Sequence, residues 1–433
     1  RTLTWPSGMV WDGGTEPTLV DVNSTDDYHV FKLTTRDNGA TWYGKEVFKN
    51  KTGGELWVWG GAYNGDWNSG KLGLNESNTS QYSSPVQLGS DVGWSISPTI
   101  HAEDSKSFAG EKGAGSLKTD GTLWIWGSNA YGQIGDNSAT QRSSPTQVPG
   151  TTWKNVHIAG TSHYSTAVIK TDGTLWTWGR NQYWYGGSPT GGGGQLGHST
   201  NTNYSSPVQI PGTTWKTCYM SSLMGGATKT DGTLWVWGRN DVGQLGQNNL
   251  TNYKSPVQVP GTTWKEIGGG SGTHAYLLKT DGTLWGFGSA QWGLNAAPAA
   301  YSSPVQIGSA TTWSKINAST QNVGIALKTD GTLWAWGKNF YGALGQNSIN
   351  SPDNNWISSP VQIPGTNWND ISNYSEMPFG RKTDGTIWGW GQAGYGRLGQ
   401  SNSSVSNYSS PTQIPGGWSQ ATAGNDMVLA YKA

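Results

Sequence analysis

The chain has 433 residues, more than one ordinary core supports, so a sequence of this length would normally contain two or three domains. Its 27 basic and 27 acidic residues balance, only 12% of all residues are charged, and no basic stripe stands out, which argues against a nucleic-acid partner. No polybasic segment or long apolar run predicts membrane insertion.

Residues 1–50 match the rest of the chain poorly, and we expect them to form a diverged closing segment or an attachment arm. The chain starts with Arg1 and shows no signal-peptide pattern, so we expect a processed start or a piece of a longer protein. Cys218 is the single cysteine, which excludes an intrachain disulfide, and we expect it to be a small buried side chain.

Residues 51–417 are repetitive, and their clearest marker is the heptapeptide Lys-Thr-Asp-Gly-Thr-Leu-Trp. Asp-Gly between β-prone runs predicts a hairpin with a two-residue type I′ turn, in which both central residues have positive φ. In the strand that follows, Leu234 and Val236 share one face, and the flanking tryptophans share the other, which predicts a blade packed on both sides. The marker, including a diverged first copy, occurs at residues 51–57, 118–124, 170–176, 229–235, 279–285, 328–334 and 382–388.

Two further elements complete each repeat. A Gly-Gln-Leu-Gly loop or a variant follows the marker strand; its glycines should have positive φ, and its Leu or Ile should fill the space between blades. A segment such as Ser-Ser-Pro-Val-Gln-Ile-Pro-Gly then predicts an edge strand, and a Trp opens the strand that leads to the next marker. Repeats of about 50 residues with four strands are typical of propeller blades.

The complete pattern resembles the chromosome-condensation-regulator repeat, which is seen in full between His157 and Gly197. The resemblance covers residues 50–433 and implies a seven-bladed β-propeller with circular closure. Members of that family include nuclear nucleotide-exchange factors and inhibitors of secreted enzymes, and Trp-rich bacterial and phage chains of this style look like surface or virion components. The resemblance therefore implies the fold and leaves the function open.

Residues 418–433 look like the first half of another repeat, in which Met427–Tyr431 matches the strand before the marker turn. We predict that the two chain ends complete one blade together and that Thr2–Trp5 supplies the next strand, so that deletion of Arg1–Pro6 lowers the melting temperature. Residues 27–50 are either the first half of an eighth blade or an inserted arm. Because the marker occurs seven times, we predict an all-β fold with seven four-stranded blades.

The repeat itself offers no catalytic constellation. A catalytic residue is normally unique in a chain, so side chains present in every repeat are predicted to be structural, as are His163 and His274 at matching repeat positions. No histidine pair at metal spacing, nucleophile elbow or phosphate-binding loop is present, so we predict no enzyme activity, no metal and no cofactor. The predicted structural residues are Asp120, Asp172, Asp231, Asp281, Asp330 and Asp384, with Trp124, Trp176, Trp235, Trp285, Trp334 and Trp388.

Aromatic residues gather where the repeat is interrupted. Each interruption follows a marker strand, and equivalent loops of a ring project on one face, so these residues could form a binding patch. Aromatic rings beside Asn, Asp and Gln are typical of sugar recognition; the alternative is that the rings fold back as plugs between blades. The candidate ligand-binding residues are Tyr63, Trp67, Tyr183, Trp184, Tyr185, Trp292 and Trp356.

We therefore expect a non-enzymatic binding or structural domain on a virion or microbial cell surface, outside the cell. Its expected partner is a protein of a larger assembly or a surface glycan. Two alternatives are a regulatory propeller, such as a guanine-nucleotide exchange factor, and a protein inhibitor of a secreted enzyme. A face with unique charged residues would favour the exchange factor, and a cluster of unique acidic residues would favour an enzyme.

Overall fold

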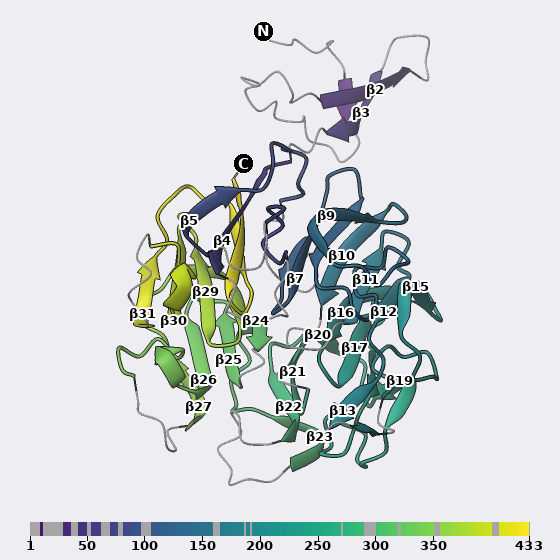
Figure 1. Cartoon of the computed structure of the whole chain (residues 1–433), viewed down its shortest axis with the longest axis vertical. Coiled ribbons are helices and arrows are strands. Elements are labelled where there is room, and N and C mark those ends of the chain that lie inside the picture. The colour runs from purple at the N-terminus through teal and green to yellow at the C-terminus, as the bar shows by residue number, and fades with distance from the viewer. Residues whose placement is uncertain are drawn as a thin grey trace. The chain divides into compact units, whose positions relative to one another are not determined.

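A computed structural model of the chain contains two compact units, residues 1–53 and 54–433 (Figure 1). Five strands, at residues 9–11, 29–35, 42–49, 183–185 and 188–190, are described by their backbone alone. The remaining described residues are 53–61, 70–76, 81–96, 105–158, 165–182, 193–269, 272–289, 300–318, 322–349, 356–400 and 407–432. No helix in these ranges is long and apolar enough to cross a membrane.

The first unit holds a three-stranded sheet of its own. Its central strand β3 (Trp42–Lys49) pairs in parallel with β1 (Met9–Trp11) and antiparallel with β2 (His29–Thr35). The hairpin within residues 27–50 therefore pairs with β1 and does not form half of an eighth blade.

The second unit contains seven four-stranded antiparallel sheets, the blades. Blades 1 to 3 consist of β6 (Ser107–Ala109), β7 (Gly113–Leu117), β8 (Leu123–Gly127) and β9 (Arg142–Val148); β10 (Trp153–Ile158), β11 (Ser165–Lys170), β12 (Leu175–Gly179) and β15 (Tyr204–Ile210); and β16 (Trp215–Met220), β17 (Met224–Lys229), β18 (Leu234–Gly238) and β19 (Tyr253–Val259). Blade 2 also carries a two-stranded insertion, β13 (Tyr183–Tyr185) with β14 (Ser188–Thr190).

Blades 4 to 6 repeat the same strand order. They consist of β20 (Trp264–Gly269), β21 (His274–Lys279), β22 (Leu284–Ser289) and β23 (Ala300–Gln306); β24 (Trp313–Ala318), β25 (Val323–Lys328), β26 (Leu333–Lys338) and β27 (Trp356–Gln362); and β28 (Trp368–Tyr374), β29 (Met377–Lys382), β30 (Ile387–Gln392) and β31 (Asn407–Gln413). Short 3-10 turns, η1 (Phe340–Gly342) and η2 (Gly394–Gly396), follow the third strands of blades 5 and 6.

Blade 7 closes the ring with strands from both ends of the second unit. Its order is β32 (Gln420–Ala423), β33 (Met427–Lys432), β4 (Glu55–Gly61) and β5 (Gln81–Gln87). The first strand of each blade contacts the first strand of the next, from β6 through to β32, and β32 contacts β6 again. The first strands are therefore innermost, and the predicted seven-bladed, all-β propeller is confirmed.

The closing strand differs from the prediction. Residues 418–433 do supply the first half of a blade, but β33 lies between β32 and β4, with Ala430 opposite Trp57. The place predicted for Thr2–Trp5, which lies outside the described residues, is thus taken by β4. The physical reason is that β4 carries the complete Leu-Trp-x-Trp-Gly pattern, whose Leu56, Val58 and Trp59 are fully buried.

The marker turn is not the predicted type I′ turn. In blade 1 the Lys118 N–H donates to the Thr122 carbonyl at 2.8 Å, and the Gly121 N–H donates to the Lys118 carbonyl at 3.0 Å. Gly121 has a φ of 81°, whereas Asp120 does not have positive φ. This is a three-residue loop with glycine at its left-handed position. The Asp120 carboxylate holds it by accepting bonds from the N–H and hydroxyl of Thr122, at 2.9 and 2.6 Å.

The marker lysines lie between two tryptophan rings. In blade 2 the Lys170 ammonium is 4.5 Å from the ring centroids of both Trp153 and Trp176, a cation–π arrangement. In blade 7 the lysine is Lys432, which lies over Trp57 and Trp418 at 4.4 and 4.7 Å. We predicted a hairpin for the first marker copy, at residues 51–57. Instead, β4 pairs with the C-terminal strand β33, and Lys432 of that strand takes the place of the marker lysine.

In five of the seven blades, the second tryptophan of the marker strand joins the blade to its neighbour. Trp178 of blade 2 donates its indole N–H to the Gln133 carbonyl of blade 1 at 3.0 Å. The bond recurs from Trp237 to Gln195, from Trp390 to Ala343, from Trp59 to Arg397 and from Trp126 to Lys71. Each acceptor lies in a Gly-x-Leu-Gly loop, whose glycines have positive φ and whose Leu or Ile is buried, as predicted; Ile134, for example, has no exposed surface.

Candidate functional site at the two ends of the ring

Antiparallel pairing places the connections of every blade alternately at two ends of the ring. The marker turns lie at one end, together with the connections from each fourth strand to the next first strand; we call this the turn end. The turns between first and second strands, together with the connections from third to fourth strands, lie at the opposite end, which we call the loop end. Residues that are not part of the repeat are found at both ends.

In sequence, the seven candidate aromatic residues fall between the third and the fourth strand of a blade or, for Trp356, at the start of the fourth strand. Tyr183, Trp184 and Tyr185 form β13, which pairs with β14, and Trp356 opens β27 opposite Lys338. Only the backbone of these four is described. Tyr63, Trp67 and Trp292 lie outside the described residues. Their role in binding a ligand remains a prediction.

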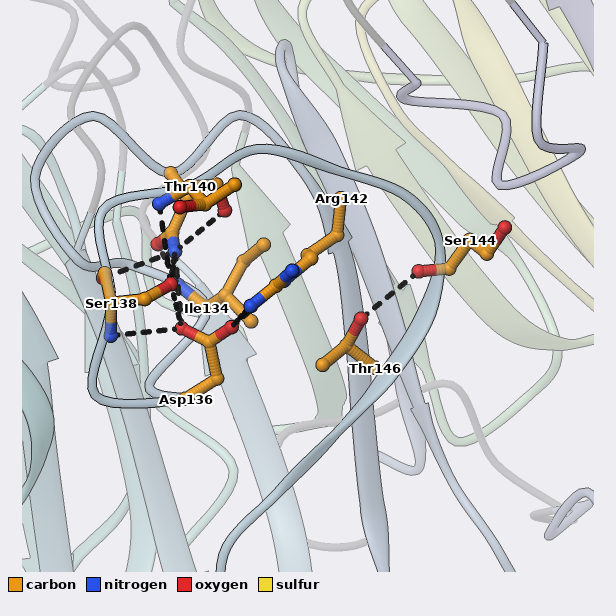
Figure 2. A network of polar contacts seen from close by, with 8 residues as sticks. Ile134, Asp136, Ser138, Thr140, Arg142, Ser144 and Thr146 are labelled. Atoms are coloured by element: carbon orange, nitrogen blue, oxygen red, sulfur yellow. Dashed lines mark hydrogen bonds and ion pairs between the residues drawn. The ribbon is translucent and has the colours of Figure 1, made fainter.

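The loop-end connection of blade 1 is fixed by a polar network (Figure 2). The Asp136 carboxylate accepts bonds from the N–H and hydroxyl of Ser138, at 3.1 and 2.7 Å, and from Nε of Arg142 at 2.9 Å. Burial raises the pKa of Asp136, but the bonds from Ser138 and Arg142 outweigh it and hold the pKa below its usual value. Asn129 accepts the Ile134 N–H at 2.9 Å, and its side-chain amide donates to the Thr140 carbonyl. The connection is thus held in one shape by its own side chains.

A buried charged cluster lies at the loop end where blade 7 is completed. The Asp426 carboxylate, in the turn between β32 and β33, accepts a bond from the Lys71 ammonium at 3.1 Å and pairs with the Arg397 guanidinium. The three side chains have only 1 to 6% of their surface exposed. Burial lowers the pKa of Lys71, against the opposing effect of Asp426. Close by, burial raises the pKa of Glu376.

The sequence interpretation contained no unique polar constellation, so this cluster was missed. A signal for it does exist. Lys71 and Arg397 occupy the variable position of the Gly-x-Leu-Gly loop that is Gln133, Gln195 and Gln244 in blades 1 to 3. The paired charges are buried and come from three distant chain segments, so the cluster links the last turn of the chain to connections of blades 6 and 7.

Two histidines are held neutral by burial. His274 has 2% of its surface exposed, and burial lowers its pKa to about 3. His157 accepts the Met220 N–H at Nδ1, at 3.1 Å, and burial lowers its pKa to about 4. Cys218 is buried as expected, which raises the pKa of its thiol to about 12. His163 lies outside the described residues, and the described part of the chain contains no group of His, Cys, Asp and Glu suited to a metal ion.

Lysines gather at the turn end, around the innermost strands. Blades 2, 3 and 4 each carry a lysine directly after the tryptophan that opens the first strand. In blade 5 the lysine lies one position further along the strand, and in blade 1 it directly precedes β6. Lys154 and Lys216 are exposed, and the others are half-buried. Several reach across to the next blade: Lys106 donates to the Lys154 carbonyl at 2.9 Å, and Lys265 donates to the Ser314 carbonyl at 2.8 Å. The set is Lys106, Lys154, Lys216, Lys265 and Lys315, which we call the lysine arc.

A cavity of about 310 Å³ opens at the turn end between blades 2 and 3. Lys154 and Lys216 of the lysine arc line it, together with the marker lysine Lys170 and its neighbour Asp172. The remaining lining is Thr171, Gly173, Thr213, Thr214, Trp215 and Thr230. Ammonium groups and hydroxyls therefore dominate the cavity, and its one carboxylate already accepts two bonds from Thr174, at 2.9 and 2.7 Å.

A sequence profile of the Regulator of chromosome condensation (RCC1) repeat matches residues 120–168, 231–275, 330–373 and 384–431. Each match begins at the aspartate of a marker turn and ends in the first or second strand of the following blade. A sequence repeat therefore contributes strands to two neighbouring blades. The last match ends in β33, which pairs with β4.

Curated proteins match parts of the chain. The ultraviolet-B receptor UVR8 of Arabidopsis thaliana is 25% identical over 43% of this chain and 38% of its own length. The mitochondrial RCC1 domain-containing protein RUG3 of Arabidopsis thaliana is 29% identical over 43% of the chain and 41% of its own length. The human E3 ubiquitin-protein ligase HERC2 is 28% identical over 29% of the chain, which is 2% of that protein. The chain thus spans less than half of these relatives.

Solved structures match far more of the chain. Yeast RCC1 (Prp20), solved bound to Kap60, has a TM-score of 0.69 and 16% identity, and the match covers 88% of this chain and 89% of that one. Prp20p of Saccharomyces cerevisiae, described with its binding to Gsp1p and histones, gives the same TM-score and identity over 88% of this chain and 91% of its own. Human WBSCR16 has a TM-score of 0.68 and 17% identity over 87% and 98% of the two chains. At such identities the likeness shows the fold alone.

Proposed function

Since the chain is a β-propeller built of RCC1 repeats, we propose that it is a non-catalytic binding propeller that engages a partner protein at one end of the ring. The observation that carries this proposal is that the repeated and the variable side chains have different surroundings. The repeated Asp, Thr, Trp and Lys of the marker bond to or pack on one another, whereas the loop-end connections and the lysine arc differ from blade to blade. A rigid ring that presents variable ends is a common scaffold for recognition.

A protein partner is supported by one of the similar propellers, because yeast Prp20p binds Gsp1p and histones. That protein shares the fold with this chain, so the analogy concerns the mode of binding and not the identity of the partner. A regulatory propeller that acts on another protein is the same kind of function. We place the chain on a virion or microbial cell surface, on the strength of its low charge and its many Asn, Ser, Thr and Gly residues.

Selection from a displayed library of random peptides tests the protein-binding function. The purified chain should enrich peptide families whose binding is lost when residues at one end are changed and retained when residues at the other end are changed. Enrichment that is insensitive to changes at either end, or no enrichment at all, would contradict a binding function located at an end of the ring.

A surface glycan is the second candidate ligand, and the aromatic residues in the loop-end connections favour it. A glycan array probed with the chain, with Trp67→Ala and with Trp184→Ala distinguishes the two. Selective glycan binding that both variants lose would identify an aromatic sugar-binding end. A clean absence of glycan binding leaves the protein partner as the ligand class.

A further inference from the structure

We propose that the turn end binds an acidic segment of the partner protein, with a carboxylate seated in the cavity between blades 2 and 3. This inference rests on the proposed protein-binding function and deepens it by naming the end and the chemistry of the ligand. The first observation is the lysine arc, a local positive charge in a chain whose overall charge is neutral. Lys106, Lys154, Lys216, Lys265 and Lys315 belong to five successive blades.

The charge balance around the innermost strands is positive among the described residues. Two carboxylates stand at equivalent strand positions, Glu266 and Asp370, and only 1 to 2% of their surface is exposed. Asp370 pairs with Lys315 at 2.9 Å. Solvent therefore meets the ammonium groups and not these carboxylates. Glu103 and Asp104, which precede the first blade in sequence, lie outside the described residues.

The outer part of the turn end has a different charge pattern. The marker turns of blades 1 to 6 each carry one exposed aspartate two residues after the marker lysine, so each aspartate offsets one lysine; in blade 1, Asp91 also pairs with Lys118. The aspartate is already engaged; Asp172 accepts two bonds from Thr174, which lower its pKa. An acidic ligand is thus attracted to the inner arc and not to the rim. Such a pattern favours a short acidic segment centred near the axis over a broad acidic surface.

The cavity gives this attraction a defined place. Lys154 and Lys216 line its wall from neighbouring blades, and Lys170 is held in position between Trp153 and Trp176. Four threonine residues complete the lining, and their hydroxyls can donate to an oxygen that the ammonium groups attract. A carboxylate is small enough for a cavity of about 310 Å³ and accepts bonds from several such donors at once.

Binding of a fluorescein-labelled hexaglutamate peptide, measured by fluorescence anisotropy on the full chain, tests this site. Hexaglutamine and hexalysine serve as control peptides. We expect hexaglutamate alone to bind, more weakly as salt is raised. Lys154→Gln combined with Lys216→Gln should weaken binding by about tenfold or more, because two of the charges that attract the peptide carboxylates are removed. Both lysines are exposed, so the double variant should fold and melt like the parent chain.

The matched control is Lys112→Gln combined with Lys254→Gln, which removes the same charge away from the cavity. Equal loss of affinity in both double variants would show non-specific charge attraction and overturn the proposal. Tighter binding of a sulfated oligosaccharide or a DNA oligonucleotide at the same lysines would overturn the assignment to a peptide. Library peptides that are not acidic and depend on the loop end would refute the acidic site while leaving the protein-binding function in place.

Discussion

Replacing Asp426 with asparagine tests how the ring is held closed. Asp426 pairs with both Lys71 and Arg397, and it joins the C-terminal turn to the chain near β4 and to blade 6. Asparagine keeps the shape and one acceptor oxygen but removes the charge, so two buried cations lose this counterion. Removing one partner of a buried ion pair costs about 3–5 kcal/mol, and we expect a loss of unfolding free energy in that range.

The loss of unfolding free energy in Asp426→Asn should depend on pH. Burial already lowers the pKa of Lys71, and without Asp426 the main opposing effect is gone. Lys71 would then lose its proton more readily in the folded state than in the unfolded chain. Its folded pKa lies below its unfolded value, so stability rises as the pH rises from the folded pKa toward the unfolded one. The variant should therefore regain part of its stability as the pH is raised from neutral toward the unfolded pKa of lysine, about 10.4.

Equilibrium unfolding in urea, followed by the fluorescence of the 27 tryptophans, measures both effects. Asp241→Asn is the matched control, because Asp241 pairs with Arg239 at a site where 44% and 25% of the two side chains are exposed. That exposed pair should contribute less than about 1 kcal/mol. If Asp426→Asn cost no more than Asp241→Asn, the cluster would not hold the ring closed.

Three further predictions concern the packing of the ring. Trp237→Phe removes the indole bond to the Gln195 carbonyl at 2.7 Å and should lower the free energy of unfolding in urea by about 2 kcal/mol. Blade 4 has phenylalanine at the equivalent position, Phe287, which is buried. A failure of the variant to fold would therefore contradict the alignment of the blades. Burial lowers the pKa of His274 to about 3, so the unfolded chain gains a proton below about pH 6.5 that the folded chain does not, and about 2 kcal/mol of stability should be lost between pH 7 and pH 5. This loss of stability between pH 7 and pH 5 should be absent in His274→Gln. If the variant and the parent chain showed the same dependence of stability on pH, the prediction for His274 would be refuted. Deleting residues 427–433 removes β33 and should abolish the cooperative melt in calorimetry, whereas deleting residues 1–6 should leave the melting temperature of the ring unchanged, because β4 already pairs with β33.

The repeat could be predicted from sequence because its signals are local. Positive φ at Gly132 and Gly135 and the burial of Ile134 follow from one tetrapeptide, and that tetrapeptide recurs. The turn type could not be predicted in the same way. Asp120 uses its carboxylate to bind Thr122, and this side-chain bond, rather than positive φ at the aspartate, fixes the loop.

The parts that sequence reasoning missed depend on residues that are far apart in the chain. Trp94, whose ring centroid is 5.1 Å from the Lys118 ammonium, has no neighbouring repeat pattern, and only the fold shows that it replaces the opening tryptophan of blade 1. Lys71 and Asp426 are 355 positions apart. The lysine arc combines one residue from each of five blades, so no stretch of sequence looks basic. The binding role of the aromatic connections remains a prediction.

The offset between sequence repeat and blade has a consequence for how such a chain can change in evolution. Each repeat ends partway through a blade, so its two edges are complementary parts of one sheet. Duplication or loss of a whole repeat in the gene leaves those edges unchanged, and the first and last parts can still pair. Ring size is then limited by the angle between neighbouring blades and not by the closure. In such a family, single repeats can change, and with them the residues exposed at either end of the ring, while the pairing that closes the ring stays the same.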